Sequence, residues 1–418
     1  MSLQNAGQHA CRFCGTVPLA DFIDLGAMPL ANSYVTAQQV AAGDDRRFPL
    51  HVRVCPSCFL VQADAPVSPD AIFSGDYAYF SSYSDSWVAH ARDYARAMTK
   101  RFSLGPDSLV VEVASNDGYL LQHFVAEGIP VLGIEPAANT AESARAKNVP
   151  TEVAFFGEET ARRLASGGVA ADLMAANNVL AHVPDILDFL RGFPLLLKPE
   201  GTITFEFPHL LNLILELQFD TIYHEHYSYL SLLAVERVLA GANLRAYDVE
   251  TVPTHGGSLR LFVCHANARF AETHALERVR AEEHGWNLDR LDGYAGFTEK
   301  VEAVRDSFLA FLAQARAEGK KVAAYGAAAK GNTFLNYCGV TSDDIVCVFD
   351  RSKAKQGRFL PGSHIRILDP EAAPAVRPDY LVILPWNLRV EIAGQMAGIA
   401  RWGGKFVTAL PKTQVFSP

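Results

Sequence analysis

The 418-residue sequence has no apolar run long enough to cross a bilayer and no cluster of basic residues. Its formal net charge is -9, whereas nucleic-acid-binding proteins hold phosphate backbones with clustered lysine and arginine. The first ten residues also lack the basic and apolar segments of a secretion signal. These absences argue against a nucleic-acid partner and a membrane anchor, and we expect a cytoplasmic protein.

Cysteine is also scarce, but four of the seven cysteines form two pairs with two-residue spacers, Cys11 with Cys14 and Cys55 with Cys58. Two such pairs can hold a structural zinc ion through four thiolates. The pairs are 40 residues apart, which is longer than in the usual finger but leaves room for a small antiparallel insert. The alternatives are disulfides, which a cytoplasmic setting disfavours, and a redox motif, which would need a strand and a helix around one pair.

From residue 108 onward, strand-like and helix-length segments alternate, after an amphipathic helix expected over residues 84–101. This alternation predicts a mostly parallel sheet with helices on both faces. The last two strands are separated by a short turn, so we expect a hairpin at the edge of the sheet. The predicted strands are residues 108–113, 131–134, 151–155, 172–176, 202–207, 245–252 and 258–264.

Acidic side chains follow the first two of these strands. Glu112 and Asp117 lie at the first strand end, and Glu135 follows the second about twenty residues later. This arrangement is typical of a nucleoside-binding site, in which an acidic residue accepts hydrogen bonds from the ribose hydroxyls. The first loop keeps one glycine, Gly118, and its carboxylates would repel a pyrophosphate. An adenosine ligand with a positive centre fits better, and S-adenosylmethionine is that ligand.

Five consecutive proton-handling side chains, from Tyr223 to Tyr227, follow the strand that ends near Pro208. His, Glu and Tyr are the usual side chains for moving a proton at carbon or oxygen. In a helix, Tyr223, His226 and Tyr227 would share one face. The alternative is a solvated polar loop, but the position after a strand end favours a catalytic cluster.

The last third of the chain repeats the alternating pattern after helical segments over residues 271–318. A strand over residues 320–325 leads into a run of small residues and the next helix, which carries Lys330 and Asn332. Small residues let a helix amino terminus approach a phosphate closely. This region would grip a nucleotide diphosphate, with Lys355 behind it, or else it is a degenerate fold that only supports the rest.

The motifs together resemble the sugar C-methyltransferases, over essentially the whole chain. The motifs that carry the resemblance are the two Cys-x-x-Cys pairs, Tyr77-Ala-Tyr79 with Ser81-Ser82, Val-Glu-x-x-Ser-Asn-Asp-Gly, Asn177-Asn178 to His182, Phe205-Glu-Phe-Pro208, Tyr223 to His226, and Tyr325 to Gly331. The resemblance implies three domains: a zinc-binding domain with an aromatic lid segment (residues 1–80), an S-adenosylmethionine domain with a class I methyltransferase-like doubly wound α/β sheet (81–268), and a helical connector with a second Rossmann-like α/β domain (269–418). One departure is Ala114, where the family commonly has glycine.

The resemblance also implies the roles of individual residues. The catalytic residues would be Tyr77, His182, Tyr223, Glu225 and His226. The cofactor would contact Glu112, Ser115, Asn116, Asp117, Gly118, Glu135, Asn177 and Asn178. The substrate would contact Tyr79, Ser82, Lys330, Asn332 and Lys355, and the zinc ion would be held by Cys11, Cys14, Cys55 and Cys58.

The implied reaction is C-methylation of a nucleotide-linked 4-keto-6-deoxysugar at C3 or C5, with thymidine diphosphate as the expected nucleotide. His226 would remove the acidic proton to form an enolate, with Glu225 supporting it, and Tyr223 is the alternative base. An O- or N-methyltransferase, an NAD-dependent nucleotide-sugar oxidoreductase and a non-catalytic zinc scaffold remain open as alternatives. We expect a monomer, because no heptads or long exposed apolar segment are evident.

Overall fold

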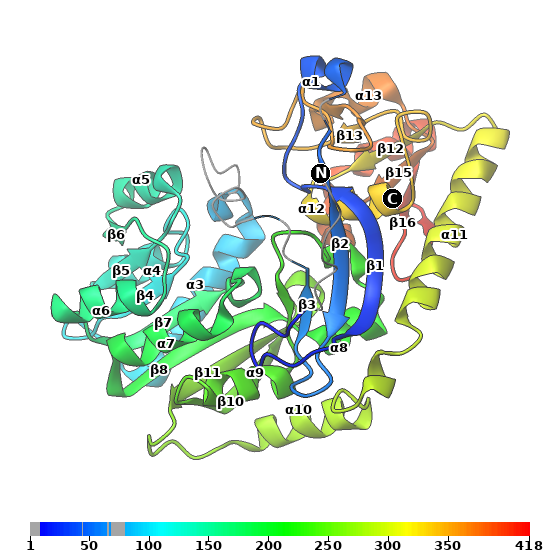
Figure 1. Cartoon of the computed structure of the whole chain (residues 1–418). Helices are drawn as coiled ribbons and strands as arrows, with labels where there is room; N and C mark the ends of the chain where they lie inside the picture. Colours follow the sequence, from blue (N-terminus) through cyan, green and yellow to red (C-terminus); the bar gives the residue numbers. More distant parts are fainter. Residues whose placement is uncertain (1–8, 44, 65–66, 68–79) are drawn as a thin grey trace.

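The computed structural model describes residues 9–43, 45–64, 67 and 80–418. The chain begins with an antiparallel sheet whose first two strands form a long curved hairpin, blue in Figure 1. Helix α1 (Ala37–Ala42), capped by Thr36, lies between these strands. The sheet has the order β1 (Ala20–Pro29), β2 (Arg47–Val54), β3 (Val61–Ala63) and β9 (Ser228–Tyr229). The predicted antiparallel insert between the cysteine pairs is therefore confirmed.

The central sheet has seven strands in the order β10-β11-β8-β7-β4-β5-β6, and only β11 runs against its neighbours. In chain order its strands are β4 (Val110–Val113), β5 (Val131–Ile134), β6 (Thr151–Glu152), β7 (Ala171–Asn177), β8 (Leu197–Pro208), β10 (Leu244–Val252) and β11 (Ser258–His265). The strand order reverses between β4 and β7, and doubly wound sheets bind ligands outside the carboxyl ends of strands at such a point. The predicted doubly wound sheet and edge hairpin are confirmed.

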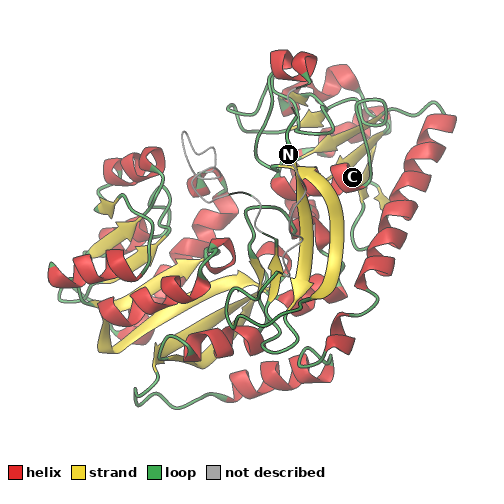
Figure 2. Cartoon of the chain, in the orientation of Figure 1, coloured by secondary structure: helices red, strands yellow, loops and turns green. Residues whose placement is uncertain are grey.

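Helices cover both faces of this sheet, as Figure 2 shows in red. The predicted amphipathic helix is α3 (Asp85–Phe102), which begins at a Ser84 cap and buries Ala91, Tyr94, Ala95 and Met98. The other helices are α4 (Leu121–Ala126), α5 (Ala138–Ala146), α6 (Glu158–Ser166), α7 (Ile186–Leu196), α8 (Leu210–Leu215) and α9 (Leu232–Ala240). Among the residues that the structure describes, no helix is long and apolar enough to cross a membrane.

Two helices, α10 (His274–Gly285) and α11 (Phe297–Ala317), connect the central sheet to a third sheet (Figure 1). This sheet has the order β14-β13-β12-β15-β16-β17, parallel except for β17. Its strands are β12 (Val322–Tyr325), β13 (Val348–Phe349), β14 (Ile367–Leu368), β15 (Tyr380–Ile383), β16 (Lys405–Thr408) and β17 (Gln414–Phe416). Its helices are α12 (Ala329–Tyr337), α13 (Ala373–Val376) and α14 (Arg389–Gln395).

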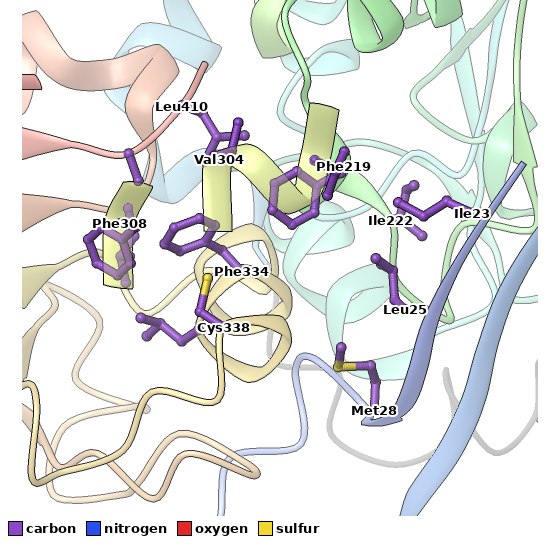
Figure 3. Close-up of a cluster of buried hydrophobic side chains, with 14 of the residues drawn as sticks. Ile23, Leu25, Met28, Phe219, Ile222, Val304, Phe308, Phe334, Cys338 and Leu410 are labelled. Atoms are coloured by element: carbon purple, nitrogen blue, oxygen red, sulfur yellow. The ribbon is translucent and has the colours of Figure 1, made fainter. Parts of the chain in front are cut away.

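One buried core joins the amino-terminal sheet to the third sheet. Figure 3 shows Ile23, Leu25 and Met28 of β1 near Phe219 and Ile222, which precede the Tyr223–Tyr227 segment, and Phe334 of α12 on the other side. Buried apolar area contributes about 25 cal/mol per Å² to stability, so these contacts fix the loop against both its neighbours. The segment that carries the predicted catalytic residues is thus held from two sides by a common core.

Candidate active site

Four sulfur atoms come together where the two cysteine pairs meet. The Sγ atoms of Cys11, Cys14, Cys55 and Cys58 all lie within 4.8 Å of one another, and the Cys11–Cys58 and Cys14–Cys55 distances are 3.5 Å. Zn–S bonds of about 2.3 Å place the sulfur atoms of a tetrahedral site about 3.8 Å apart. The donor set therefore fits a structural zinc ion, as predicted.

The zinc-binding region is joined to the Tyr223–Tyr227 loop through backbone contacts. The Arg12 guanidinium, inside the first cysteine pair, donates to the carbonyl oxygens of Ala63 and Tyr227. Immediately after Tyr227 the chain forms β9, which pairs with β3. The end of the loop is therefore an edge strand of the zinc-bearing sheet.

His226 is the best-placed base in this loop. Its Nδ1 lies 2.8 Å from the carbonyl oxygen of Thr221, so Nδ1 carries the proton and Nε2 is the acceptor of the neutral ring. Burial lowers the pKa of His226 well below its usual value, and the His182 ring 4.6 Å away contributes to the same effect. His226 is therefore neutral near pH 7. Thr221, rather than Glu225, makes the contact that orients it.

Aromatic and imidazole rings surround His226. The Tyr223 ring centroid lies 4.0 Å from that of His226, and the Tyr229 centroid lies at 6.2 Å. His182, in the 3-10 turn Leu180–His182 that follows β7, has its pKa lowered to about 4 by burial. Tyr229 lies on β9 and was not anticipated from the sequence.

The five clustered residues divide into two groups, because the segment is a turn and not a helix. The Tyr223 and His226 rings contact each other at an interplanar angle of 35°, whereas His224 points to the Phe48 and Pro49 carbonyls of β2. The Tyr227 hydroxyl donates to the Val67 carbonyl. The shared helical face considered for Tyr223, His226 and Tyr227 is therefore absent.

Glu225 faces the amino-terminal part of the chain. Its Oε1 accepts a hydrogen bond of 2.6 Å from the Asn32 amide, which follows β1. Burial raises the pKa of Glu225, and the Asn32 bond opposes that shift. Nearby, the Tyr34 hydroxyl donates to the Ala327 carbonyl of the third sheet, so this segment links Glu225 to the carboxy-terminal part.

The third sheet also supplies side chains to the site. The Trp386 indole donates to Asp220 Oδ2 at 2.8 Å, and Asp220 is 1% exposed in the 3-10 turn before Thr221. Lys330 Nζ lies 5.1 Å from the Trp386 ring centroid, and its charge lowers the pKa of both His226 and His255. Of these residues, the sequence pointed only to Lys330, as a diphosphate ligand.

The tip of the β10–β11 hairpin packs against the same groups. A Cβ on Gly256 would come within 2.4 Å of Trp386 Cη2, and Gly256 has a φ of +94°. His255 lies edge-on to Trp87 of α3, with ring centroids 5.1 Å apart. A glycine is therefore required where the hairpin meets the third sheet.

A buried ionic network lies beneath this hairpin. Glu206 of β8, fully buried, accepts hydrogen bonds from Arg260 of β11 at 2.7 Å, from His90 of α3 at 2.9 Å and from Thr254 at 2.9 Å. Burial alone would raise the pKa of Glu206, but His90 and Arg260 outweigh it and bring the pKa to about 2. The network ties α3 to the turn that carries His255.

The loop after β4 has the predicted acidic lining. Asn116 and Ala137 donate their backbone N–H groups to the Glu135 carboxylate, each at 2.9 Å. Glu112 is fully buried, and burial raises its pKa well above the usual value, with Glu135 and Asp117 adding repulsion. A cationic ligand relieves such repulsion and a phosphate increases it, so these residues fit S-adenosylmethionine.

Small residues in and beside the cofactor loop allow neighbouring segments to pack closely. Gly118 has a φ of +75°, and a Cβ there would lie 3.1 Å from Val149. The Ser115 hydroxyl lies against Gly133 of β5, where a Cβ would approach it to 2.4 Å. Ala114 has a φ of +58°, a left-handed conformation that costs alanine free energy and that glycine adopts freely.

The remaining predicted ligands are distributed as follows. Ser82 contacts the Asp117 carboxylate and receives a hydrogen bond of 2.7 Å from Lys147, so it lies at the cofactor loop. Asn177 is the last residue of β7. The backbone N–H of the next residue, Asn178, donates to the Glu206 carbonyl. Tyr77 and Tyr79 lie outside the described residues.

The turn between β12 and α12 is occupied by contacts within the protein. Ala327 donates its N–H to Asp350 and accepts a hydrogen bond of 2.8 Å from Lys355. Asn332 is 2% exposed, and its amide donates to the Ala31 carbonyl. Asn332 thus links α12 to the segment after β1, and its expected contact with the substrate stays a prediction.

Comparison with known proteins identifies the class. Three family profiles match successive parts of the chain: a zinc binding domain at residues 11–73, a methyltransferase domain at 87–249 and a C-methyltransferase C-terminal domain at 253–411. The chain is 36% identical over 407 residues to the C-methyltransferase NovU of Streptomyces niveus, covering 97% of this chain and 96% of that protein. This chain belongs to the C-methyltransferase family.

Solved structures resemble this C-methyltransferase over less than half its length. An S-adenosylmethionine-dependent methyltransferase from Clostridium acetobutylicum has a TM-score of 0.35 and 11% identity, covering 43% of this chain and 92% of that one. Magnesium protoporphyrin IX methyltransferase from Synechocystis with S-adenosylhomocysteine also has a TM-score of 0.35, at 16% identity, covering 47% and 91%.

The enzyme is therefore an S-adenosylmethionine-dependent C-methyltransferase with a zinc-binding amino-terminal domain. The family assignment favours C-methylation over two alternatives from the sequence, which are methyl transfer to oxygen or nitrogen and NAD-dependent oxidoreduction. The matches to methyltransferase domains also argue against a non-catalytic zinc scaffold. The predicted domain boundaries at residues 80 and 268 stay predictions.

Proposed function

We propose that this C-methyltransferase methylates C3 or C5 of a nucleotide-linked 4-keto-6-deoxysugar, with thymidine diphosphate as the nucleotide. The observation that carries the proposal is His226, a half-buried neutral imidazole whose Nδ1 donates to the Thr221 carbonyl and whose Nε2 is the nitrogen that can accept a proton. Proton removal beside a ketone needs such a base, and the C4 keto group makes the neighbouring hydrogen acidic.

The chemistry uses the chain's own residues for all but the methyl group. His226 Nε2 takes the proton from the carbon next to C4, the C–H electron pair forms a C=C bond, and the carbonyl π pair moves to oxygen. Tyr223, whose ring contacts that of His226 at a tilt, is placed to hydrogen-bond the sugar or the enolate oxygen. When bound, S-adenosylmethionine supplies an electrophilic methyl group to the enolate carbon.

His182 and Glu225 support this arrangement in the proposal. His182 packs edge-on to His226 and stays neutral because burial lowers its pKa, so it lines the reaction site without opposing proton transfer to His226. Glu225 acts through its Asn32 bond, which fixes the loop against the segment after β1. Tyr77 keeps its expected place in the catalytic set by the resemblance.

The nucleotide end of the substrate is proposed to meet the carboxy-terminal domain. Lys355, which reaches the β12–α12 turn and lies 5.1 Å from the Tyr34 ring, is the cation offered to the diphosphate. Lysine binds phosphate as a point charge. Binding of thymidine diphosphate would then depend on Lys355 and not on the buried Asn332.

His226→Asn tests the base, because the amide keeps a polar group but has no basic nitrogen. We expect turnover to fall at least 10²-fold, the usual contribution of a general base, with S-adenosylhomocysteine affinity unchanged. The rate is measured as methylated sugar formed, and the affinity by isothermal titration. Substantial remaining activity would transfer the role of base to Tyr223.

Titration of the intact enzyme with S-adenosylhomocysteine and then thymidine diphosphate tests the substrate class. Binding of both supports a two-substrate sugar methyltransferase. Binding of the first alone would remove the nucleotide from the proposal while leaving the methyltransferase in place.

A further inference from the structure

Lys330 is held at the junction of the catalytic loop and the third sheet. Its Nζ lies 3.4 Å from Asn387 Oδ1 and 5.1 Å from the Trp386 ring centroid. Trp386 in turn donates to the buried carboxylate of Asp220, which is six residues before His226 in the chain. These contacts place the Lys330 ammonium beside Trp386, which is itself bonded to the segment before the Tyr223–Tyr227 loop.

The helix that carries Lys330 is fixed to the same loop. Thr333, one turn further along α12, donates its hydroxyl to the Ile222 carbonyl at 3.0 Å, next to Tyr223. Phe334 packs against Phe219 with ring centroids 5.9 Å apart. The start of α12 and the loop of His226 therefore form one rigid unit, so Lys330 has a set position relative to the base.

The charges around this position favour one added negative charge. His226, His182 and His255 are neutral because burial lowers the pKa of each, and Lys330 adds to that effect at His226 and His255. Burial lowers the pKa of Lys330 and the Asp220 carboxylate opposes that shift, while burial raises the pKa of Asp220 to about 6. A diphosphate carries more than one negative charge, and the Asp220 carboxylate would repel it. An enolate carries a single negative charge, which is spread over oxygen and carbon.

We propose that Lys330 is a catalytic residue that stabilises the enolate oxygen, and that Asp220 and Trp386 are positioning residues that hold its ammonium group. The inference rests on the proposed function. When His226 Nε2 takes the proton, negative charge develops on the C4 oxygen, and it disappears when the carbon–methyl bond forms and the carbonyl returns. A fixed cation then interacts more strongly with the transition state than with the ketone, which is what accelerates the step.

Proton removal can be measured without methyl transfer. The full-length zinc enzyme with S-adenosylhomocysteine is incubated in D2O with a thymidine-diphosphate-linked 4-keto-6-deoxysugar, and deuterium entry beside the ketone is followed by mass spectrometry. For Lys330→Met we expect exchange at saturating sugar to fall about 10²–10³-fold, as when an oxyanion donor is removed. Thymidine diphosphate affinity should stay within about threefold of wild type.

Lys355→Met is the matched lysine variant. It should weaken thymidine diphosphate binding and raise KM, while exchange at saturating sugar stays closer to wild type than in Lys330→Met. If instead Lys330→Met loses nucleotide affinity and exchanges normally at saturation, Lys330 is a diphosphate ligand and the inference is overturned. Absence of exchange in the wild-type enzyme would overturn the proposed sugar substrate itself.

The positioning residues are tested with Lys330 left in place. Asp220→Asn and Trp386→Phe should each lower kcat for exchange about tenfold with little change in KM, because the ammonium loses its fixed place but the sugar is still bound. Lys330→Arg keeps the charge and should recover part of the rate lost in Lys330→Met. Equal loss in Lys330→Arg and Lys330→Met, with zinc content and thermal midpoint as in wild type, would contradict a role for the charge.

Discussion

Replacing Arg260 by methionine tests the buried network of Glu206. The change removes the 2.7 Å bond to a carboxylate that is fully buried, and His90 and Thr254 alone cannot balance its charge. The pKa of Glu206 is about 2 in the folded protein against an ordinary 4.5, a difference that corresponds to about 3 kcal/mol of stability. Loss of one partner of a buried pair costs a similar amount, about 3–5 kcal/mol.

The sign of the pH dependence follows from the lowered pKa. Ionised Glu206 stabilises the wild-type fold fully above the unfolded-state pKa of 4.5, and this stabilisation is lost as the pH falls toward 2. The difference between Arg260→Met and wild type should therefore be largest near neutral pH and narrow below pH 4.5. The double variant Glu206→Leu with Arg260→Met should recover most of the stability that Arg260→Met loses, because it leaves neither charge of the buried pair.

Hydrogen–deuterium exchange of the β8–β11 amides is the direct assay, because these strands carry both partners. A loss of about 3 kcal/mol should speed exchange there roughly 100-fold at neutral pH. Glu250→Gln is the control, since it removes the other, 42% exposed partner of Arg260 and should cost under about 1 kcal/mol. Equal effects of Arg260→Met and Glu250→Gln would refute the assignment of the stabilising charge to Glu206.

Three further outcomes are expected. Cys55→Ser should release zinc, measured by metal analysis, and lower turnover, because the zinc-bearing sheet includes the strand that ends the catalytic loop; full activity without zinc would contradict this. Ala114→Val should lower the free energy of unfolding by about 1–2 kcal/mol, measured by thermal unfolding, whereas Ala114→Gly should not, since φ there is +58°. Gly256→Ala should displace Trp386, visible in tryptophan emission, and reduce kcat, while Gly394→Ala, which meets no atom within 4 Å, should leave both unchanged.

Much of the central domain could be predicted because its signals are local. Apolar β-branched runs gave strands within a few residues of β4, β5, β7, β10 and β11. In the third sheet, β13 is limited to Val348–Phe349, because Asp344 accepts the Thr341 N–H and the segment before the strand is a turn. The spacing of apolar residues predicts which face of a strand or helix is buried, but it does not predict a turn that is held by a hydrogen bond from a backbone N–H to a side chain.

Part of the candidate active site was predictable for the same reason. The position of His226 after a strand end could be read from the sequence, but its orienting partner, Thr221, is a backbone carbonyl that has no sequence signature. Asp220, Trp386 and His255 reach the site through contacts between segments far apart in the chain. Such contacts depend on domain packing, which a single sequence does not report.

The two-residue strand β9 has a consequence for how the protein is made. β3 ends at Ala63 and β9 begins at Ser228, so the ribosome must release five of the seven strands of the central sheet before the amino-terminal sheet gains its last strand. Until then β3 presents an unpaired edge, which is prone to pair with other chains. Expression of the zinc-binding segment alone would leave that edge permanently open, and grafting it onto a related enzyme would require moving the catalytic loop with it.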